Sequence, residues 1–156
     1  MGRFYPDLAQ KGAFPIEFWK IEDDDLFWEA IGYLPLFMYE VWSTRLDDLS
    51  EGFKLAYPIF SIEDDYFVNG WTALTYAGTW LLPHAVSAFR RVGMATEADA
   101  LQAALEVIDL DPEDVEAAEA AYKSVPNVYA DDERKMSALM TFFRQNSHLF
   151  YESPGA

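Results

Sequence analysis

The residues with the clearest chemical potential are carboxylates, which recur in short runs directly before bulky aromatic side chains. Two of these runs are nearly alike, "KIEDDDLFW" at residues 20–28 and "SIEDDYFVNGW" at residues 61–71. Clustered carboxylates can bind a divalent cation, supply a general acid and base, or present a negative surface to a cationic partner. They can also simply begin helices, because the first turn of a helix favours negative charge.

A calcium-binding loop is the first chemical interpretation to test. "DLDPEDVEAAEA" begins Asp109-x-Asp111, as an EF-hand loop does. The sixth position, which should be Gly, is Asp114, and the twelfth, which should be Glu, is Ala120. Pro112 also indicates a helix start where the loop should wrap around the ion. The sequence therefore predicts no dedicated metal site and no cofactor, and it leaves open whether a divalent cation binds loosely.

Catalytic arrangements lack supporting motifs. The only histidines, His84 and His148, have no Glu three residues before them, as a di-metal carboxylate bundle would require. The chain has no Gly-x-Ser-x-Gly elbow, no cysteine and no phosphate-cradling glycine loop. A glycosidase pair stays open only because 27 acidic residues offer many pairs. We interpret the protein as non-enzymatic, with a small hydrolase or metal-dependent enzyme as the weakest alternative.

Helices must position these carboxylates, because strand patterns are poor throughout the chain. Helical spacing of apolar residues extends from about Asp23 to Asp48, with a bend at Pro35. A short helix is predicted in "LSEGFKLAY", and a separate one from Ser61 to Asn69-Gly70. The remaining predicted helices begin near Pro83, near Thr96, after Asp111 as N-cap, and near Asp132, the last one extending to Tyr151.

These elements predict an all-α fold, a single compact domain of about six to eight helices over residues 1–156. Residues 1–20 are predicted to be irregular. The composition is 51% apolar and 17% aromatic, which is enough for a large core. We expect the core to hold most of the aromatic side chains and an excess to cover a subunit interface, so that a homodimer is an open prediction; the aromatic residues in question are Phe27, Trp28, Trp42, Phe67, Trp71, Trp80 and Phe142.

The uncharged stretch from Trp71 to Phe89 is long enough to span a bilayer. Its many Thr, Ser, Gly, Pro and His residues instead favour a buried helix, a break and a second helix. We therefore expect no membrane contact. The lack of cysteine and of an apolar segment near the N-terminus predicts a cytoplasmic protein.

Helix capping explains the position of the acidic runs but not their number. Carboxylates at helix starts each stabilise by about 0.3–1 kcal/mol. However, 27 acidic residues face 11 basic ones, which gives a formal net charge of −16. Between Arg91 and Lys123 there are nine acids and no basic residue. Asp109 even lies at a predicted helix C-terminus, which is the unfavourable end for an anion.

Such a charge repels nucleic acid and anionic membranes and attracts a basic protein. Carboxylates at helical i, i+3 and i+4 positions stand about 5–6 Å apart, which is comparable with the spacing of DNA phosphates. The sequence thus predicts a protein that blocks a cationic, DNA-binding surface of a partner by DNA mimicry. An immunity or antitoxin-type inhibitor of a basic toxin, such as a nuclease, is the alternative. The predicted partner-binding acidic face consists of Asp23, Asp24, Asp25, Glu63, Asp64, Asp65, Glu106, Asp109, Asp111, Glu113, Asp114 and Glu116.

Residues 62–151 resemble the bacterial DNA mimic protein 19 family, a group of small, acidic, helical proteins. The matching segments are "EDDYFVNGW", "TALTYAGTW", "AVSAFRRVG" and "ADALQAALEVI", followed by "FFRQNSHLFY" near the end. Asn69 and Gly70 match the family's helix-ending motif and would be structural. The resemblance implies a dimer whose acidic face occupies the DNA-binding surface of a partner such as a transcriptional repressor.

Overall fold

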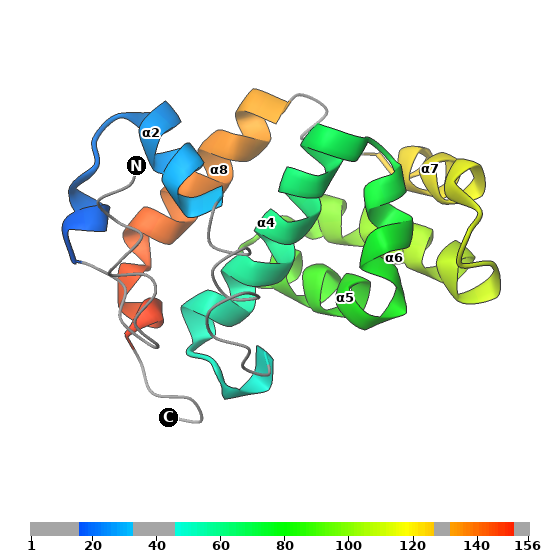
Figure 1. The fold of residues 1–156 in the computed structure, drawn as a ribbon, viewed down its shortest axis with the longest axis horizontal. Helices are drawn as coiled ribbons and strands as arrows, with labels where there is room; N and C mark the ends of the chain where they lie inside the picture. Colours follow the sequence, from blue (N-terminus) through cyan, green and yellow to red (C-terminus); the bar gives the residue numbers. More distant parts are fainter. Residues whose placement is uncertain (1–15, 33–45, 127–131, 152–156) are drawn as a thin grey trace.

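The structure is a computed structural model that describes residues 16–32, 46–126 and 132–151 (Figure 1). Six α-helices and three short 3-10 helices, without a strand, make up the regular structure of these ranges. The predicted all-α fold is therefore confirmed. None of these helices is both long and apolar enough to cross a membrane.

From α4 to α7, each helix packs against the next one along the chain. Helix α4 packs against α5, α5 against α6, and α6 against α7, while α2 and α8 lie together on the other side of α4 (Figure 1). The α-helices are α2 (Asp24–Gly32), α4 (Glu51–Asn69), α5 (Thr72–Arg91), α6 (Ala95–Leu110), α7 (Val115–Ser124) and α8 (Asp132–Gln145). The 3-10 helices are η2 (Ile16–Lys20), η4 (Leu46–Asp48) and η5 (Ser147–Phe150).

Helix α4 replaces the two helices predicted on either side of Ser61. It begins after Ser50 and continues through Pro58 to Asn69. A proline inside a helix removes one hydrogen bond and crowds the preceding turn. The apolar face of α4 continues past Pro58, where Ile59 and Phe60 are fully buried, so tertiary packing outweighs the local preference. The predicted end is confirmed, since Gly70 has a φ of 63°.

Helix α5 contains the predicted break, but at a different residue. Gly78 has φ 55° and ψ −165°, a backbone conformation that residues other than glycine rarely adopt. The break therefore falls at Gly78 and not at Pro83, which lies inside the second half of the helix. The end near Gly93 is confirmed by its φ of 86°.

The starts of the next two helices also differ from prediction. Helix α6 begins at Ala95, one residue before the expected Thr96, and Met94 precedes it without a side-chain cap. The N-cap of α7 is Asp114, whose carboxylate accepts from the Ala117 N–H, so the prediction of Asp111 in this role is wrong. Asp111 instead ends α6.

The core joins both ends of the described chain. Phe18 is fully buried within η2, although this part of residues 1–20 was predicted to be irregular. The Trp19 indole N–H donates to the Tyr151 hydroxyl at 2.8 Å, and the Trp19 ring packs at a tilt against the Phe150 ring. Apolar anchors thus order a segment that lacks a long helical pattern. Residues 1–15, and the predicted bend at Pro35, lie outside the described residues.

Most of the described residues in the predicted aromatic set lie in the core or against it. Phe27 is buried, and Trp28, Trp71 and Phe142 pack partly buried against the core. Phe67 is 90% exposed and Trp80 is also mainly exposed, so these two form the excess outside the core, and a subunit interface over them stays a prediction. Helical spacing alone does not distinguish a core aromatic residue from an exposed one. Trp42 lies outside the described residues.

Candidate functional site

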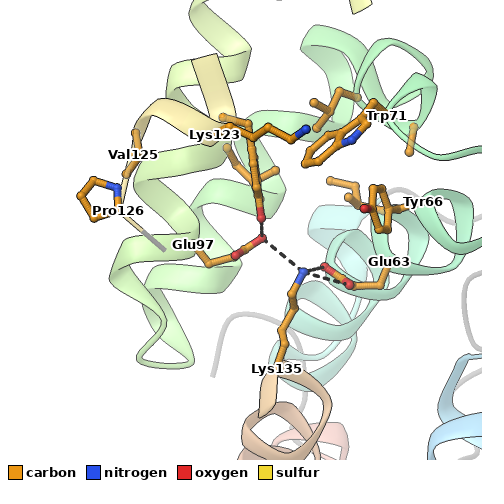
Figure 2. A pocket seen from close by; sticks show the side chains of 13 residues that line it. Glu63, Tyr66, Trp71, Glu97, Lys123, Val125, Pro126 and Lys135 are labelled. Carbon is orange, nitrogen blue, oxygen red and sulfur yellow. Dashed lines mark hydrogen bonds and ion pairs between the residues drawn. The ribbon is translucent and has the colours of Figure 1, made fainter. Parts of the chain in front are cut away.

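A cavity of about 390 Å³ lies among α4, α5, α6, α7 and α8 (Figure 2). Its wall combines apolar and aromatic side chains with four charged ones. The apolar and aromatic part consists of Ile62, Tyr66, Trp71, Ala73, Leu74, Leu101, Tyr122, Val125 and Pro126. Glu63, Glu97, Lys123 and Lys135 are the charged members. A volume of this order, mainly apolar lining and a few convergent polar groups are typical of small-ligand sites.

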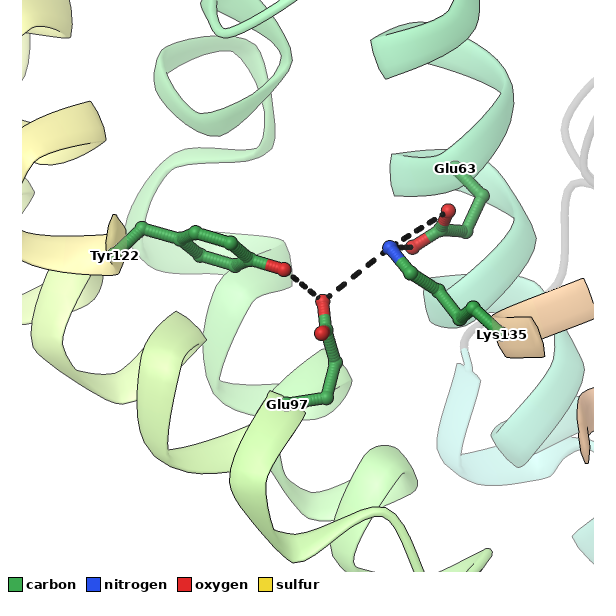
Figure 3. Close-up of polar contacts among 4 residues, drawn as sticks. All are labelled: Glu63, Glu97, Tyr122 and Lys135. Carbon is green, nitrogen blue, oxygen red and sulfur yellow. Dashed lines mark hydrogen bonds and ion pairs between the residues drawn. The ribbon is translucent and has the colours of Figure 1, made fainter. Parts of the chain in front are cut away.

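A nearly buried charge cluster forms one side of the cavity (Figure 3). The Lys135 ammonium donates to both carboxylate oxygens of Glu63, with Nζ–Oε distances of 3.1 and 3.2 Å. It also lies 3.5 Å from Oε1 of Glu97, which accepts a hydrogen bond from the Tyr122 hydroxyl. The exposed fractions of the Lys135, Glu63 and Glu97 side chains are only 9%, 12% and 2%. Charges so far from water are stable only when they are paired.

The charge cluster brings together four helices that are distant in sequence. Glu63 comes from α4, Glu97 from α6, Tyr122 from α7 and Lys135 from α8. Glu97 and Lys135 occupy core positions of their helices, since the buried residues Leu101 and Leu139 follow them at i+4. A charged residue in an apolar helical stripe is the sequence signal for such pairing. The sequence-based site omitted Glu97, Tyr122 and Lys135, because periodicity does not identify their partners.

Aromatic rings form another side of the cavity. The Trp71 ring lies 5.1 Å from Tyr66 and 5.0 Å from Tyr122, measured between centroids. The Lys123 ammonium lies 5.2 Å from the centroid of the Trp71 ring and also donates to the Glu119 carboxylate. Trp71 therefore already accepts one ammonium group on its face.

The first acidic run behaves as a helix start. Asp23 lies immediately before α2, and its carboxylate accepts from the Leu26 N–H at 2.9 Å. Asp24 forms an ion pair with Arg144 of α8. Asp23, Asp24 and Asp25 are all exposed. Helix capping, together with one ion pair, therefore accounts for the position of this run.

The second acidic run does not begin a helix, which corrects the prediction. Glu63, Asp64 and Asp65 lie in the C-terminal half of α4, because that helix starts at Glu51. The mostly buried Glu63 is paired with Lys135, and Asp65 accepts a hydrogen bond from Asn69. Glu63 therefore belongs to the internal charge cluster and not to an open acidic surface.

Asp64 makes stability depend on pH. Desolvation by burial, and secondarily repulsion from Glu63, raises the pKa of Asp64 from its ordinary value of 3.8 to about 7. At pH values between these two pKa values, Asp64 holds a proton in the folded state that it has released in the unfolded state. Its contribution to the free energy of unfolding should therefore fall as pH rises from 4 to 7. We expect Asp64→Asn to flatten this slope and to stabilise the protein at pH 8 by about 1–2 kcal/mol, after allowance for partial solvation.

Urea unfolding at several pH values checks this expectation. Glu29→Gln, a neutralisation of an exposed carboxylate on α2, serves as the control and should keep the slope of the parent protein. An unchanged slope in Asp64→Asn would show that other groups cause the pH dependence.

The third acidic group surrounds the turn between α6 and α7. We define the acidic corner as five exposed residues: Glu106, Asp109, Asp111, Glu113 and Glu116. Among the residues that the structure describes, no lysine or arginine lies within ion-pair distance of them. Leu110, which is 89% exposed, lies in the middle of this group. Asp114 is partly buried and caps α7.

The three acidic groups do not form one continuous face. Helix α2 and the turn between α6 and α7 lie at opposite ends of the long axis of the molecule (Figure 1). The run in α4 lies between them and points one carboxylate inward. Of the predicted face, the acidic corner is the group whose members are all exposed and lack a neighbouring cation in the described part of the chain.

In the described ranges, no three His, Cys, Asp or Glu side chains are placed to hold a metal ion. Both histidines are exposed. Comparison of the chain with protein-family models, curated protein sequences and solved structures gives no match. The resemblance to DNA mimic proteins therefore stays a prediction from the sequence.

Proposed function

We propose that this protein binds the cationic, DNA-binding surface of a partner protein through its acidic corner and thereby blocks that surface. The observation that carries the proposal is the charge imbalance at this corner. Five exposed carboxylates lie there without a basic neighbour among the described residues, at the cost of mutual repulsion. A basic partner would relieve this repulsion.

The distribution of cations supports the same interpretation. Arg90 pairs with Asp99, Lys123 with Glu119, Arg144 with Asp24, and Lys135 with the cavity carboxylates. The basic side chains in these pairs neutralise acids elsewhere on the molecule. The charge at the acidic corner is left for an external partner, and exposed Leu110 supplies an apolar contact at its centre.

Two partner classes fit this surface. A DNA-binding regulator would meet a row of carboxylates in place of phosphates, whereas a basic toxin such as a nuclease would be neutralised by the same charges. Competition distinguishes them. A regulator displaced from its operator by this protein supports mimicry, and a nuclease that loses its activity supports an immunity role.

Charge reversal at the acidic corner tests the proposal. We expect the triple variant Asp109→Lys, Glu113→Lys, Glu116→Lys to weaken binding to the captured partner by about 100-fold or more at low salt. Binding of the parent protein should weaken steeply between about 50 and 300 mM salt, because exposed charges are screened. Affinity can be measured by calorimetry at both salt concentrations.

The matched control reverses three exposed acids outside the acidic corner, Glu22, Glu29 and Asp47. It changes the net charge by the same amount, so it should lower the association rate somewhat and leave most of the affinity. Equal losses in the two variants would point to net charge alone. Affinity that does not change with salt or with reversal of the acidic corner would contradict the proposal.

A further inference from the structure

We propose that the cavity among α4, α5, α6, α7 and α8 binds a neutral, flat aromatic molecule that carries a hydrogen-bonding group. This site is separate from the acidic corner and does not depend on the function proposed for that surface. Three features of the cavity support the inference: the balance of charge in its lining, its aromatic wall and a tyrosine hydroxyl group in that wall.

The charged side chains of the cavity lining balance one another. The described lining contains two carboxylates, those of Glu63 and Glu97, and two ammonium groups, those of Lys123 and Lys135. Lys135 pairs with both carboxylates, and Lys123 pairs with Glu119. These lining residues therefore offer a ligand no surplus charge of either sign. A neutral ligand leaves all of these pairs as they are.

A charged ligand would bind at a disadvantage for the same reason. It would lose its hydration on entering the cavity, and it could regain a counter-charge only by competing within the pairs that Lys135 forms with Glu63 and Glu97. Breaking such pairs is costly where the side chains are mostly shielded from water. A neutral molecule avoids both costs.

The aromatic wall favours a flat aromatic ligand. The Trp71 ring contacts the rings of Tyr66 and Tyr122, with centroid distances of 5.1 and 5.0 Å (Figure 2). The ring planes meet at 69° and 60°, which are the edge-to-face and tilted geometries that aromatic rings favour. An aromatic ligand would add a further ring to this group and would also pack against Leu74 and Leu101 of the lining.

The hydroxyl group of Tyr66 supplies a polar contact. Tyr66 lines the cavity and is partly buried, and its hydroxyl makes no hydrogen bond with another residue in the described ranges. A tyrosine hydroxyl can both donate and accept a hydrogen bond. It can therefore bind an alcohol or amide group of the ligand without disturbing a hydrogen bond within the described part of the chain.

The cavity volume of about 390 Å³ limits the ligand to a fragment-sized molecule or a single side chain. Two sources supply this chemistry: a free aromatic alcohol or amide, and an aromatic side chain of a bound peptide, whose backbone provides the amide. 2-Phenylethanol represents the free molecule. The capped peptide acetyl-Gly-Phe-Gly-amide represents the side chain.

Calorimetric titration of the full chain at about 300 mM salt, where the long-range attraction of ions is screened, tests the proposal. We expect 2-phenylethanol to bind about tenfold more tightly than its charged counterparts, phenethylammonium and 3-phenylpropionate. Tighter binding of the peptide than of 2-phenylethanol would identify a side chain as the ligand, and weaker binding would identify a free molecule. Absence of 2-phenylethanol binding at millimolar concentration, or equal or tighter binding of a charged probe, would overturn the proposal.

The saturated analogue 2-cyclohexylethanol tests the requirement for an aromatic ring. It is the more apolar of the two alcohols, so hydrophobicity alone predicts that it binds more tightly. We expect it to bind about threefold more weakly than 2-phenylethanol, because it cannot make ring contacts with the aromatic wall. Equal or tighter binding of the saturated alcohol would refute the proposal of an aromatic ligand.

Two further measurements locate the ligand. Tyr66→Phe keeps the ring and removes the hydroxyl, so the affinity for 2-phenylethanol should fall by about threefold to tenfold. Tyr76→Phe makes the same change at an exposed position of α5 and should bind as the parent protein does. In the parent protein, the NMR signal of the Trp71 indole should shift on titration and that of exposed Trp80 should not. A shift of Trp80 alone, or unchanged affinity in Tyr66→Phe, would place the ligand elsewhere and contradict the proposal.

Discussion

Replacement of Lys135 by Met is expected to lower the free energy of unfolding by about 3–5 kcal/mol. The Lys135 ammonium is the cation that separates the carboxylates of Glu63 and Glu97. Met fills a similar volume, so loss of packing contributes little. The variant instead removes the ammonium that pairs with these two mostly buried carboxylates. Urea or thermal unfolding measures the deficit.

Two comparisons show whether charge causes this deficit. Protonation of one carboxylate relieves the repulsion, so the difference between variant and parent protein should shrink as pH is lowered from 7 to about 5. Neutralising both acids, in the triple variant Lys135→Met, Glu63→Gln, Glu97→Gln, should recover a large part of the lost stability. Lys20→Met, at an exposed position, is the control and should change stability by no more than about 0.5 kcal/mol. A deficit independent of pH, and equal in the triple variant, would assign it to packing.

Gly52→Ala is expected to destabilise the protein by about 1–3 kcal/mol, although alanine is the better helix former. A Cβ atom at Gly52 would lie 2.6 Å from two ring carbons of Phe150. That ring cannot retreat easily, because it is buried and packs against Trp19, Phe53 and Phe143. The overlap would therefore push η5 away from the start of α4. Thermal unfolding measures the loss.

The double variant Gly52→Ala, Phe150→Ala checks the cause. A smaller side chain at residue 150 removes the overlapping ring carbons, so the two substitutions together should destabilise less than the sum of their separate effects. Additive effects would show that the two positions do not interact. Stabilisation by Gly52→Ala alone would contradict the close packing of α4 against η5.

The sequence by itself determined the helical class and several helix ends. Helical periodicity depends on local spacing, and the glycines at positions 70 and 93 end their helices through a left-handed backbone that requires no tertiary contact. Asp23 likewise caps α2, because its carboxylate accepts a hydrogen bond from the N–H of Leu26, three residues along the chain. These features are local, so a pattern of neighbouring residues is sufficient to predict them.

Other features depend on tertiary packing, which outweighed the local preferences of the sequence. The apolar face of α4 extended the helix through Pro58, which moved Glu63 from a predicted helix start into the interior. Glu63 pairs there with Lys135 of α8, which also contacts Glu97 of α6, and no spacing along the chain identifies such contacts. The acidic residues were evident from the sequence, but only the packing of the helices separated paired, buried carboxylates from the exposed acidic corner. Burial and pairing set the energy of a charge, and both depend on groups that are distant in sequence.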